Sequence, residues 1–164
     1  MNPTKAKIIG IARRSARREP MEEIKAGSIS IDAGLQGDFK GAKHKARQIT
    51  ILAEEDWNAA LADLPEGAHA LHWTTRRANI LTSGLRLPRA EGAKLAIGDI
   101  ELEVTGQTWP CKRMDEAFPG LLKALGPEWR GGVTCSVLKG GDIALEDSIE
   151  ITHAPEERVR KLPG

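Results

Sequence analysis

Residues 94–105 read KLAIGDIELEVT, and this stretch indicates a fold built from strands. Two short apolar-polar arms flank a Gly98-Asp99 pair, which is typical of the tight turn of a β-hairpin. In the second arm, residues 99–104, acidic and apolar residues alternate strictly. Alternation at period two places one row of side chains in the core and the other in solvent. The stretch therefore predicts a half-buried hairpin.

Other short apolar segments occur on both sides of this hairpin. The sequence predicts strands around residues 8–11, 28–32, 47–52, 77–82, 133–138 and 149–152. Glycine-containing turns separate them at intervals typical of sandwiches and barrels. Most of the chain is therefore expected to be β-structure.

Helical spacing occurs in two places. Apolar residues recur every three or four positions over residues 57–64, after three acidic residues and ahead of Pro65, which predicts a helix beginning after Ala53. A second helix is expected over residues 114–125, interrupted at Pro119-Gly120. We predict a mainly β fold, α+β by content: a closed or nearly closed antiparallel β-barrel with about two accessory helices.

The chain has 164 residues and a mass of 17.8 kDa, a size that suits one domain with one well-filled core. We predict a single domain over residues 1–153 and a flexible tail over residues 154–164, which mix Pro with charge. No apolar run approaches the roughly 18 residues that span a bilayer, so we expect a cytoplasmic protein without membrane contact. Cys111 and Cys135 are expected to be thiols, and Cys135, which alternates with valines, to be buried.

The formal net charge of +1 gives no whole-molecule field that attracts nucleic acid or membranes. Cationic residues are nevertheless segregated, because residues 39–53 and 67–90 contain Lys and Arg but no acid. Loops that carry such runs can assemble one local anion site, although a solvated face is the ordinary interpretation of each run alone. The cations in question are Lys40, Lys43, Lys45, Arg47, Arg76, Arg77, Arg86 and Arg89.

Cys111 lies in the sequence TWPCKR, residues 108–113, shortly after a strand expected to end near Thr105. Lys112 and Arg113 place two cations next to the thiol. Cationic neighbours favour the thiolate, which attacks electrophiles, carries a persulfide or ligates a soft metal. The alternative is that Cys111 is a small buried residue beside solvated cations.

Several short motifs follow one another between about residues 5 and 152. In chain order they are Gly34-Leu35-Gln36-Gly37-Asp38, Arg47-Gln48-Ile49, Arg77-Ala78-Asn79-Ile80, Leu95-Ala96-Ile97-Gly98, Pro110-Cys111-Lys112-Arg113-Met114, Arg130-Gly131-Gly132-Val133 and Gly140-Gly141-Asp142-Ile143. Their order and spacing closely resemble a MOSC domain. This family is the C-terminal module of molybdenum-cofactor sulfurases and also occurs as small stand-alone bacterial proteins.

The resemblance implies a β-barrel-rich fold and one functional cysteine, Cys111, as both the catalytic residue and the metal ligand. In relatives this cysteine is linked to sulfur carriage or to holding molybdenum in a pterin cofactor, and in amidoxime-reducing members to reduction of N-hydroxylated substrates. The expected cofactor is therefore molybdopterin-bound molybdenum. Arginines and a glycine-rich backbone suit its phosphate and polar rings. The expected binding shell is Arg47, Arg77, Asn79, Arg113, Arg130, Gly131 and Gly132.

Two activities remain open under this resemblance: a molybdenum-cofactor-dependent oxidoreductase, which needs a redox partner protein, and a sulfur-transfer protein. The pyridoxal-phosphate domain of the sulfurases has no counterpart in these 164 residues, so a separate persulfide donor is expected. Relatives often place a His two residues after the Gly-Asp pair, whereas here Phe39-Lys40 follow it. No His is therefore assigned a role.

A function of a different class is a non-enzymatic module that binds a protein or nucleic-acid partner through basic loops. Arg13, Arg14, Arg17, Arg18 and the loop over residues 40–47 would form that surface. Binding would then weaken steeply with salt and ignore alkylation of Cys111. Because the chain has 4% aromatic residues and no Tyr, a nucleic-acid partner is the less favoured one.

Overall fold

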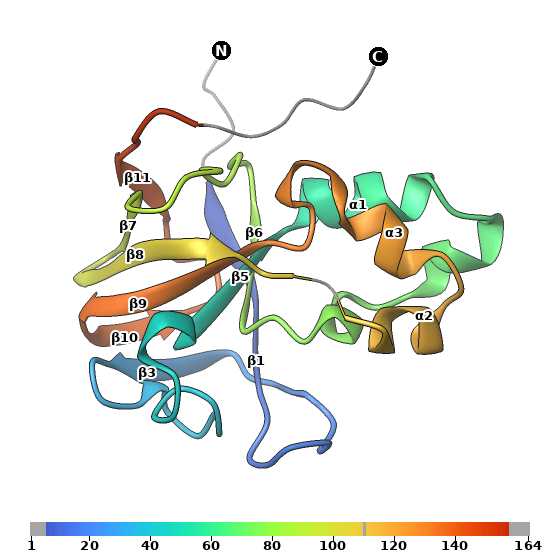
Figure 1. The fold of residues 1–164 in the computed structure, drawn as a ribbon. Coiled ribbons are helices and arrows are strands. Elements are labelled where there is room, and N and C mark those ends of the chain that lie inside the picture. The colour runs from blue at the N-terminus through green and yellow to red at the C-terminus, as the bar shows by residue number, and fades with distance from the viewer. Residues whose placement is uncertain (1–5, 110, 158–164) are drawn as a thin grey trace.

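Strands dominate the computed structural model, which describes residues 6–109 and 111–157 (Figure 1). Within these residues, eight strands form a curled sheet in the order β11-β7-β8-β9-β5-β6-β1-β2, and three form a small sheet in the order β10-β3-β4. The large sheet contains β1 (Lys7–Arg13), β2 (Glu22–Glu23), β5 (Ile49–Ala53), β6 (Ile80–Ser83), β7 (Lys94–Ile97), β8 (Ile100–Gln107), β9 (Val133–Lys139) and β11 (Glu150–His153). The small sheet contains β3 (Ala26–Ser30), β4 (Gly34–Leu35) and β10 (Gly141–Ala144).

The helices gather beside one side of this sheet, as Figure 1 shows. They are α1 (Glu54–Ala62), α2 (Arg113–Ala117) and α3 (Leu121–Leu125), joined by 3₁₀ turns η1 (Lys45–Arg47), η2 (Glu66–Ala70), η3 (Trp73–Arg76) and η4 (Pro127–Trp129). None of the helices in the described part of the chain is long and apolar enough to cross a membrane. The predicted mainly β fold with accessory helices is confirmed.

The hairpin at residues 94–105 forms as predicted, from β7 and β8. Leu95 pairs with Leu102, and Ile97 pairs with Ile100 across the turn. All four side chains are fully buried, whereas the acidic residues between them face outward. The alternation of the sequence therefore directly specifies which face of this hairpin enters the core.

Strand β5 separates two apolar clusters and is buried on both faces. Ile51 belongs to the cluster inside the curled sheet, while its neighbour Leu52 belongs to the cluster beneath the helices. Successive residues of a strand point to opposite faces, so one strand supplies both clusters. Helix α1 covers the second cluster with Trp57 and Leu61.

Two expectations need correction in detail. Strand β5 pairs with β6 in parallel, because the connection between them, residues 54–79, is long enough for a crossover that contains α1, η2 and η3. The helix expected over residues 114–125 is two helices, α2 and α3, separated by Gly120 at φ +94°. The left-handed backbone at this glycine ends any continuous helix.

The segment after β11 differs from the expected tail up to Glu157. Arg86 donates two hydrogen bonds to the Glu157 carboxylate, at 2.8 and 2.9 Å, and the backbone N–H of Arg89 donates a third at 3.1 Å. These contacts hold residues 154–157 against the domain. The remainder of the expected tail, residues 158–164, lies outside the described residues.

We predict that Asp56→Ala destabilises the fold by about 3 kcal/mol in urea unfolding, because it leaves a buried cation without its anion. The Arg89 side chain is 5% exposed and donates to both carboxylate oxygens of Asp56, at 2.9 and 3.0 Å. The matched control is Glu157→Ala, which removes the partner of the exposed Arg86 and should cost less than about 1 kcal/mol. Equal losses of unfolding free energy in the two variants would show that the buried Arg89–Asp56 pair is no more important than the exposed Arg86–Glu157 pair.

Candidate functional site

A cavity of about 660 Å³ opens beside Cys111, and we call it the thiol cavity. Segments far apart in the sequence line it: the loop after β1, the loop over residues 39–47, the end of η3, the chain around Cys111 and the start of α2. Its lining residues are Arg14, Arg17, Phe39, Lys40, Lys43, His44, Arg47, Thr50, Arg76, Arg77, Gln107, Thr108, Trp109, Cys111, Arg113, Met114 and Thr134.

The thiol cavity is strongly cationic. Eight Lys or Arg residues and no Asp or Glu occur among its described lining residues. The fold thus brings the acid-free stretch at residues 39–53 together with part of the stretch at residues 67–90. Cations gathered without acids between them attract an anion, and the low net charge of the chain does not weaken this local field. Of the eight cations named from the charge pattern, five line this cavity: Lys40, Lys43, Arg47, Arg76 and Arg77. The other three have partners elsewhere: Lys45, Arg86 and Arg89.

Arg14 is buried in this cavity without a full set of partners. The residue is 7% exposed, and its Nη1 has no hydrogen-bond partner in the described part of the chain. Its guanidinium carbon lies 4.8 Å from the centre of the Phe39 ring, a cation-π contact. Burial lowers the pKa of Arg14, and repulsion from Arg77 lowers it further. A buried N–H donor with no acceptor is costly, so Arg14 is held here against an unfavourable free energy.

Arg76 ties two backbone segments together next to Cys111. Its Nη2 donates to the carbonyl of Thr108 at 2.8 Å, and its Nε donates to the carbonyl of Gly131 at 3.1 Å. Burial lowers the pKa of Arg76 to about 10. The Thr108 hydroxyl is also buried without a partner among the described residues. Arg76 therefore positions the segment that leads into Cys111.

The remaining cations repel one another. Burial lowers the pKa of Lys40, and so does the charge of Arg14. Burial also lowers the pKa of Arg77, followed by repulsion from Arg113, while Cys111 opposes this shift. Each cation is thus held where its charge is less stable than in water. Bound negative charge would relieve this repulsion.

Cys111 is exposed, as the functional interpretation requires. Its carbonyl accepts a hydrogen bond of 2.9 Å from the backbone N–H of Met114 at the start of α2. Trp109, 74% exposed, lies two residues earlier on the cavity wall. Cys135 is fully buried in the sheet, as predicted, and burial raises its pKa far above the ordinary thiol range.

The structure brings four of the residues expected at the site around one cavity: Cys111, Arg47, Arg77 and Arg113. Asn79 belongs elsewhere. It is 5% exposed, accepts hydrogen bonds from the Thr50 N–H and hydroxyl, and donates to the carbonyl of Ala12. With its amide satisfied by the strands, Asn79 is a structural residue and not part of the expected cofactor shell.

Arg130, Gly131 and Gly132 also lie off the described cavity lining. Arg130 pairs with Asp63 and donates to the carbonyl of Ala124. A Cβ at Gly131 would lie 2.6 Å from the Thr108 carbonyl oxygen, and a Cβ at Gly132 would lie 2.2 Å from that of Ile51. The glycine pair is thus required for close packing against the Thr108 and Ile51 carbonyls.

Sequence reasoning did not place Arg14, Arg17, Lys40 or Arg76 in the cofactor shell. Arg14 and Arg17 come from the basic run near the start of the chain, assigned only to the alternative binding surface. Lys40 and Arg76 belong to the acid-free stretches. The absence of Asp and Glu from these stretches indicated a possible anion site. It could not indicate which cations line the cavity, because tertiary packing determines the direction of their side chains.

A curled strand-rich sheet with a basic cavity beside an exposed thiol defines the class of this protein, and comparison with known proteins agrees. The family model of the MOSC domain matches residues 36–150. The chain belongs to the MOSC domain family. No curated protein matches it significantly.

Solved structures share the fold at low sequence identity. The YuaD protein from Bacillus subtilis has a TM-score of 0.75 and 17% identity, over 93% of this chain and 98% of that one. YiiM from Escherichia coli has a TM-score of 0.70 and 15% identity, over 93% and 73%. YiiM from Geobacillus stearothermophilus has a TM-score of 0.69 and 14% identity, over 90% and 75%. At these identities the likeness shows the fold alone.

We predict that Gly132→Ala destabilises the protein by about 3 kcal/mol or more, because a methyl group would overlap the Ile51 carbonyl at a backbone φ of +98°. The control is Gly98→Ala in the β7–β8 turn, where φ is +58° and nothing lies within 4 Å of the added Cβ. Gly98→Ala should lower the free energy of unfolding by about 1 kcal/mol, which is the cost of placing a non-glycine residue in the left-handed region. If both variants unfold at the same urea concentration, the close approach of Gly132 to the Ile51 carbonyl does not contribute to stability.

We also predict that iodoacetamide alkylates Cys111 and spares Cys135 in the native protein. Exposure makes the first thiol accessible, whereas burial and a raised pKa protect the second. Peptide mass spectrometry should detect Cys135 labelling only after unfolding. A Cys111→Ala variant should take up no label while folded. Equally slow labelling of the two thiols would show that Cys111 is not accessible.

Proposed function

We propose that this protein binds an anionic molybdenum-pterin cofactor in the thiol cavity, with Cys111 as the sulfur ligand of the metal. One observation carries the proposal: an acid-free cavity lined by eight cations, the buried Arg14 among them, opens beside an exposed thiol. Phosphate oxygens are strong acceptors for guanidinium groups, and a soft thiolate suits molybdenum. The donor set thus fits both ends of such a cofactor.

The residues that would hold the cofactor divide by chemistry. Arg14, Arg47 and Lys40 would neutralise its phosphate, and Arg77 and Arg113 would face the charge near the metal. Arg76 would act as a positioning residue, because its donors are already used by the Thr108 and Gly131 carbonyls. When bound, the cofactor supplies a metal centre that exchanges electron pairs, which protein side chains do not provide. As an oxidoreductase the protein would receive these electrons from a redox partner protein.

Sulfur carriage is a second candidate, favoured by the exposure of Cys111 at the cavity edge. In that reaction the Cys111 thiolate attacks the terminal sulfur of a donor persulfide. The S–S bond of the donor breaks, an S–S bond forms at Cys111, and the donor leaves as a thiolate. Arginines around the thiol would stabilise the resulting persulfide anion.

We place either function in the cytoplasm, where a reducing environment keeps Cys111 available as a thiol. A partner protein or nucleic acid bound through the basic loops is less well supported. Arg13 donates to the Gln36 carbonyl and pairs with Glu22, and Arg14 is buried. Arg14 and Arg17 line the concave thiol cavity, which suits a small anion.

The test is molybdenum quantification in protein purified from a host that makes the cofactor, together with fluorescence of the released pterin. Cys111→Ala should lose molybdenum, and Arg47→Ala, which changes an exposed residue, should retain about tenfold less pterin. Arg14→Gln should have the same effect, with circular dichroism checking its fold. Cys135→Ala and Lys139→Ala serve as thiol and charge controls.

The molybdenum and pterin contents decide between the candidates. Equal molybdenum in the parent protein and in Cys111→Ala would contradict metal ligation by this thiol. If molybdenum and pterin are absent from every preparation, cofactor binding is wrong. A mass increase of about 32 Da on Cys111 that dithiothreitol removes would then support sulfur carriage, because a sulfinic acid of the same mass is not reversed by a thiol.

A further inference from the structure

A second hollow of about 1130 Å³ adjoins the thiol cavity, and we call it the outer cavity. Arg17, Arg77 and Arg113 line both spaces. Arg18 and Lys112 line only the outer one. The three shared arginines therefore form a boundary that a ligand in either cavity can contact.

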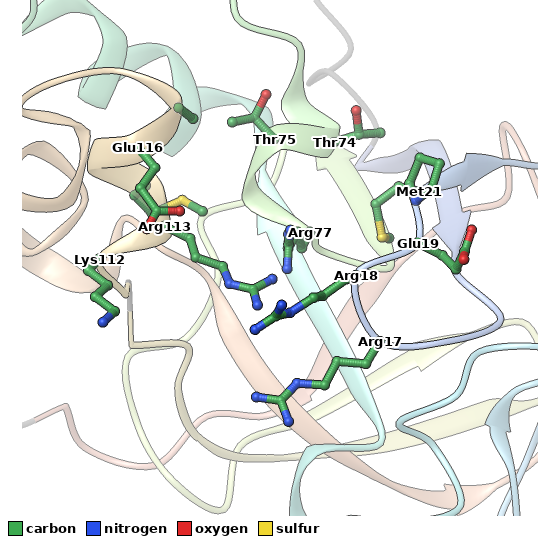
Figure 2. Close-up of a pocket in the computed structure, with 13 residues that line it drawn as sticks. Arg17, Arg18, Glu19, Met21, Thr74, Thr75, Arg77, Lys112, Arg113 and Glu116 are labelled. Carbon is green, nitrogen blue, oxygen red and sulfur yellow. The ribbon is translucent and has the colours of Figure 1, made fainter.

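The cations of the outer cavity converge. Figure 2 shows the guanidinium groups of Arg17, Arg18, Arg77 and Arg113 directed into one space, with Glu19 to one side. In the described part of the chain none of these four arginines forms a salt bridge. Repulsion from Arg113 contributes to the lowered pKa of Arg77. Five cations against two carboxylates leave this wall with excess positive charge.

Two of these arginines sit on backbone that side chains rarely adopt. Arg18 has φ +70°, and Arg77, which ends η3, has φ +66°. Residues other than glycine seldom occupy this left-handed region. The fold therefore imposes the backbone conformation at both positions, and residues held in this region are enriched at ligand sites.

The rest of the lining indicates the chemical class of the ligand. Met21, Pro20 and Met114 supply apolar surface beside the arginines. Arginines recognise a phosphate group, and the apolar part accommodates an organic body. The volume is sufficient for a molecule of nucleotide size.

We propose that the outer cavity binds the phosphate end of a phosphorylated organic substrate, whose other end extends across the shared arginines toward Cys111. This inference rests on the proposed function, because it takes the thiol cavity as the place of reaction. It adds a substrate class, the phosphate monoesters, and a recognition site separate from the cofactor. Arg18 and Lys112 are its specificity residues.

The test is isothermal titration of the full-length protein with adenosine 5′-monophosphate, and with adenosine as the uncharged control probe. The monophosphate should bind and adenosine should not. Arg18→Ala should weaken binding by about tenfold, the loss of one charge-assisted contact. Lys139→Ala, which removes an exposed charge outside the described lining of both cavities, should stay within about twofold of the parent protein.

The molybdenum content of the same variants separates this inference from the proposed function. Arg18→Ala should keep its molybdenum while losing affinity for the monophosphate. The inference is overturned if the monophosphate does not bind, if adenosine binds equally well, or if Arg47→Ala and not Arg18→Ala reduces the affinity. Loss of molybdenum in Cys111→Ala remains an independent result.

Discussion

The buried guanidinium of Arg76 is the constraint on which the site depends. Its hydrogen bonds to the Thr108 and Gly131 carbonyls join η3, the end of β8 and the turn before β9. The Thr108 N–H donates to the Gly132 carbonyl at 2.8 Å, so the end of β8 and this turn are linked twice. Cys111 follows this junction by three residues, and its position is set by it. Arg76, whose pKa is lowered by burial, thus holds together the backbone segments beside the thiol cavity.

Apolar packing around the thiol cavity stabilises the fold, whereas the cations that line the cavity repel one another. Two apolar clusters on either side of β5 supply the stability that allows several cations to lie close together. Burial and mutual repulsion lower the pKa values of Arg14, Lys40 and Arg77. Such an arrangement is less stable without bound negative charge, and it therefore favours an anion.

Sequence reasoning succeeded where local periodicity decides structure. Alternation specified the β7–β8 hairpin, and helical spacing specified α1. It also placed Cys111 on an accessible loop. It did not predict that Asn79, Gly131 and Gly132 lie off the cavity. In the sequence, an Asn that hydrogen-bonds to buried strands looks the same as one that binds a ligand. A glycine required by close packing likewise looks the same as one that approaches a ligand. Arg14 was assigned only to the alternative binding surface, and Arg76 only to a possible anion site, because tertiary packing determines where their side chains point.

The most direct measurement is anomalous diffraction at the molybdenum edge from crystals of the protein purified with its cofactor. We predict one anomalous peak within bonding distance of the Cys111 sulfur, with phosphate density in the thiol cavity. Crystals of Cys111→Ala grown in the same way should lack the peak. Molybdenum bound away from Cys111, or a thiol cavity that stays free of phosphate density in molybdenum-containing crystals, would contradict the account.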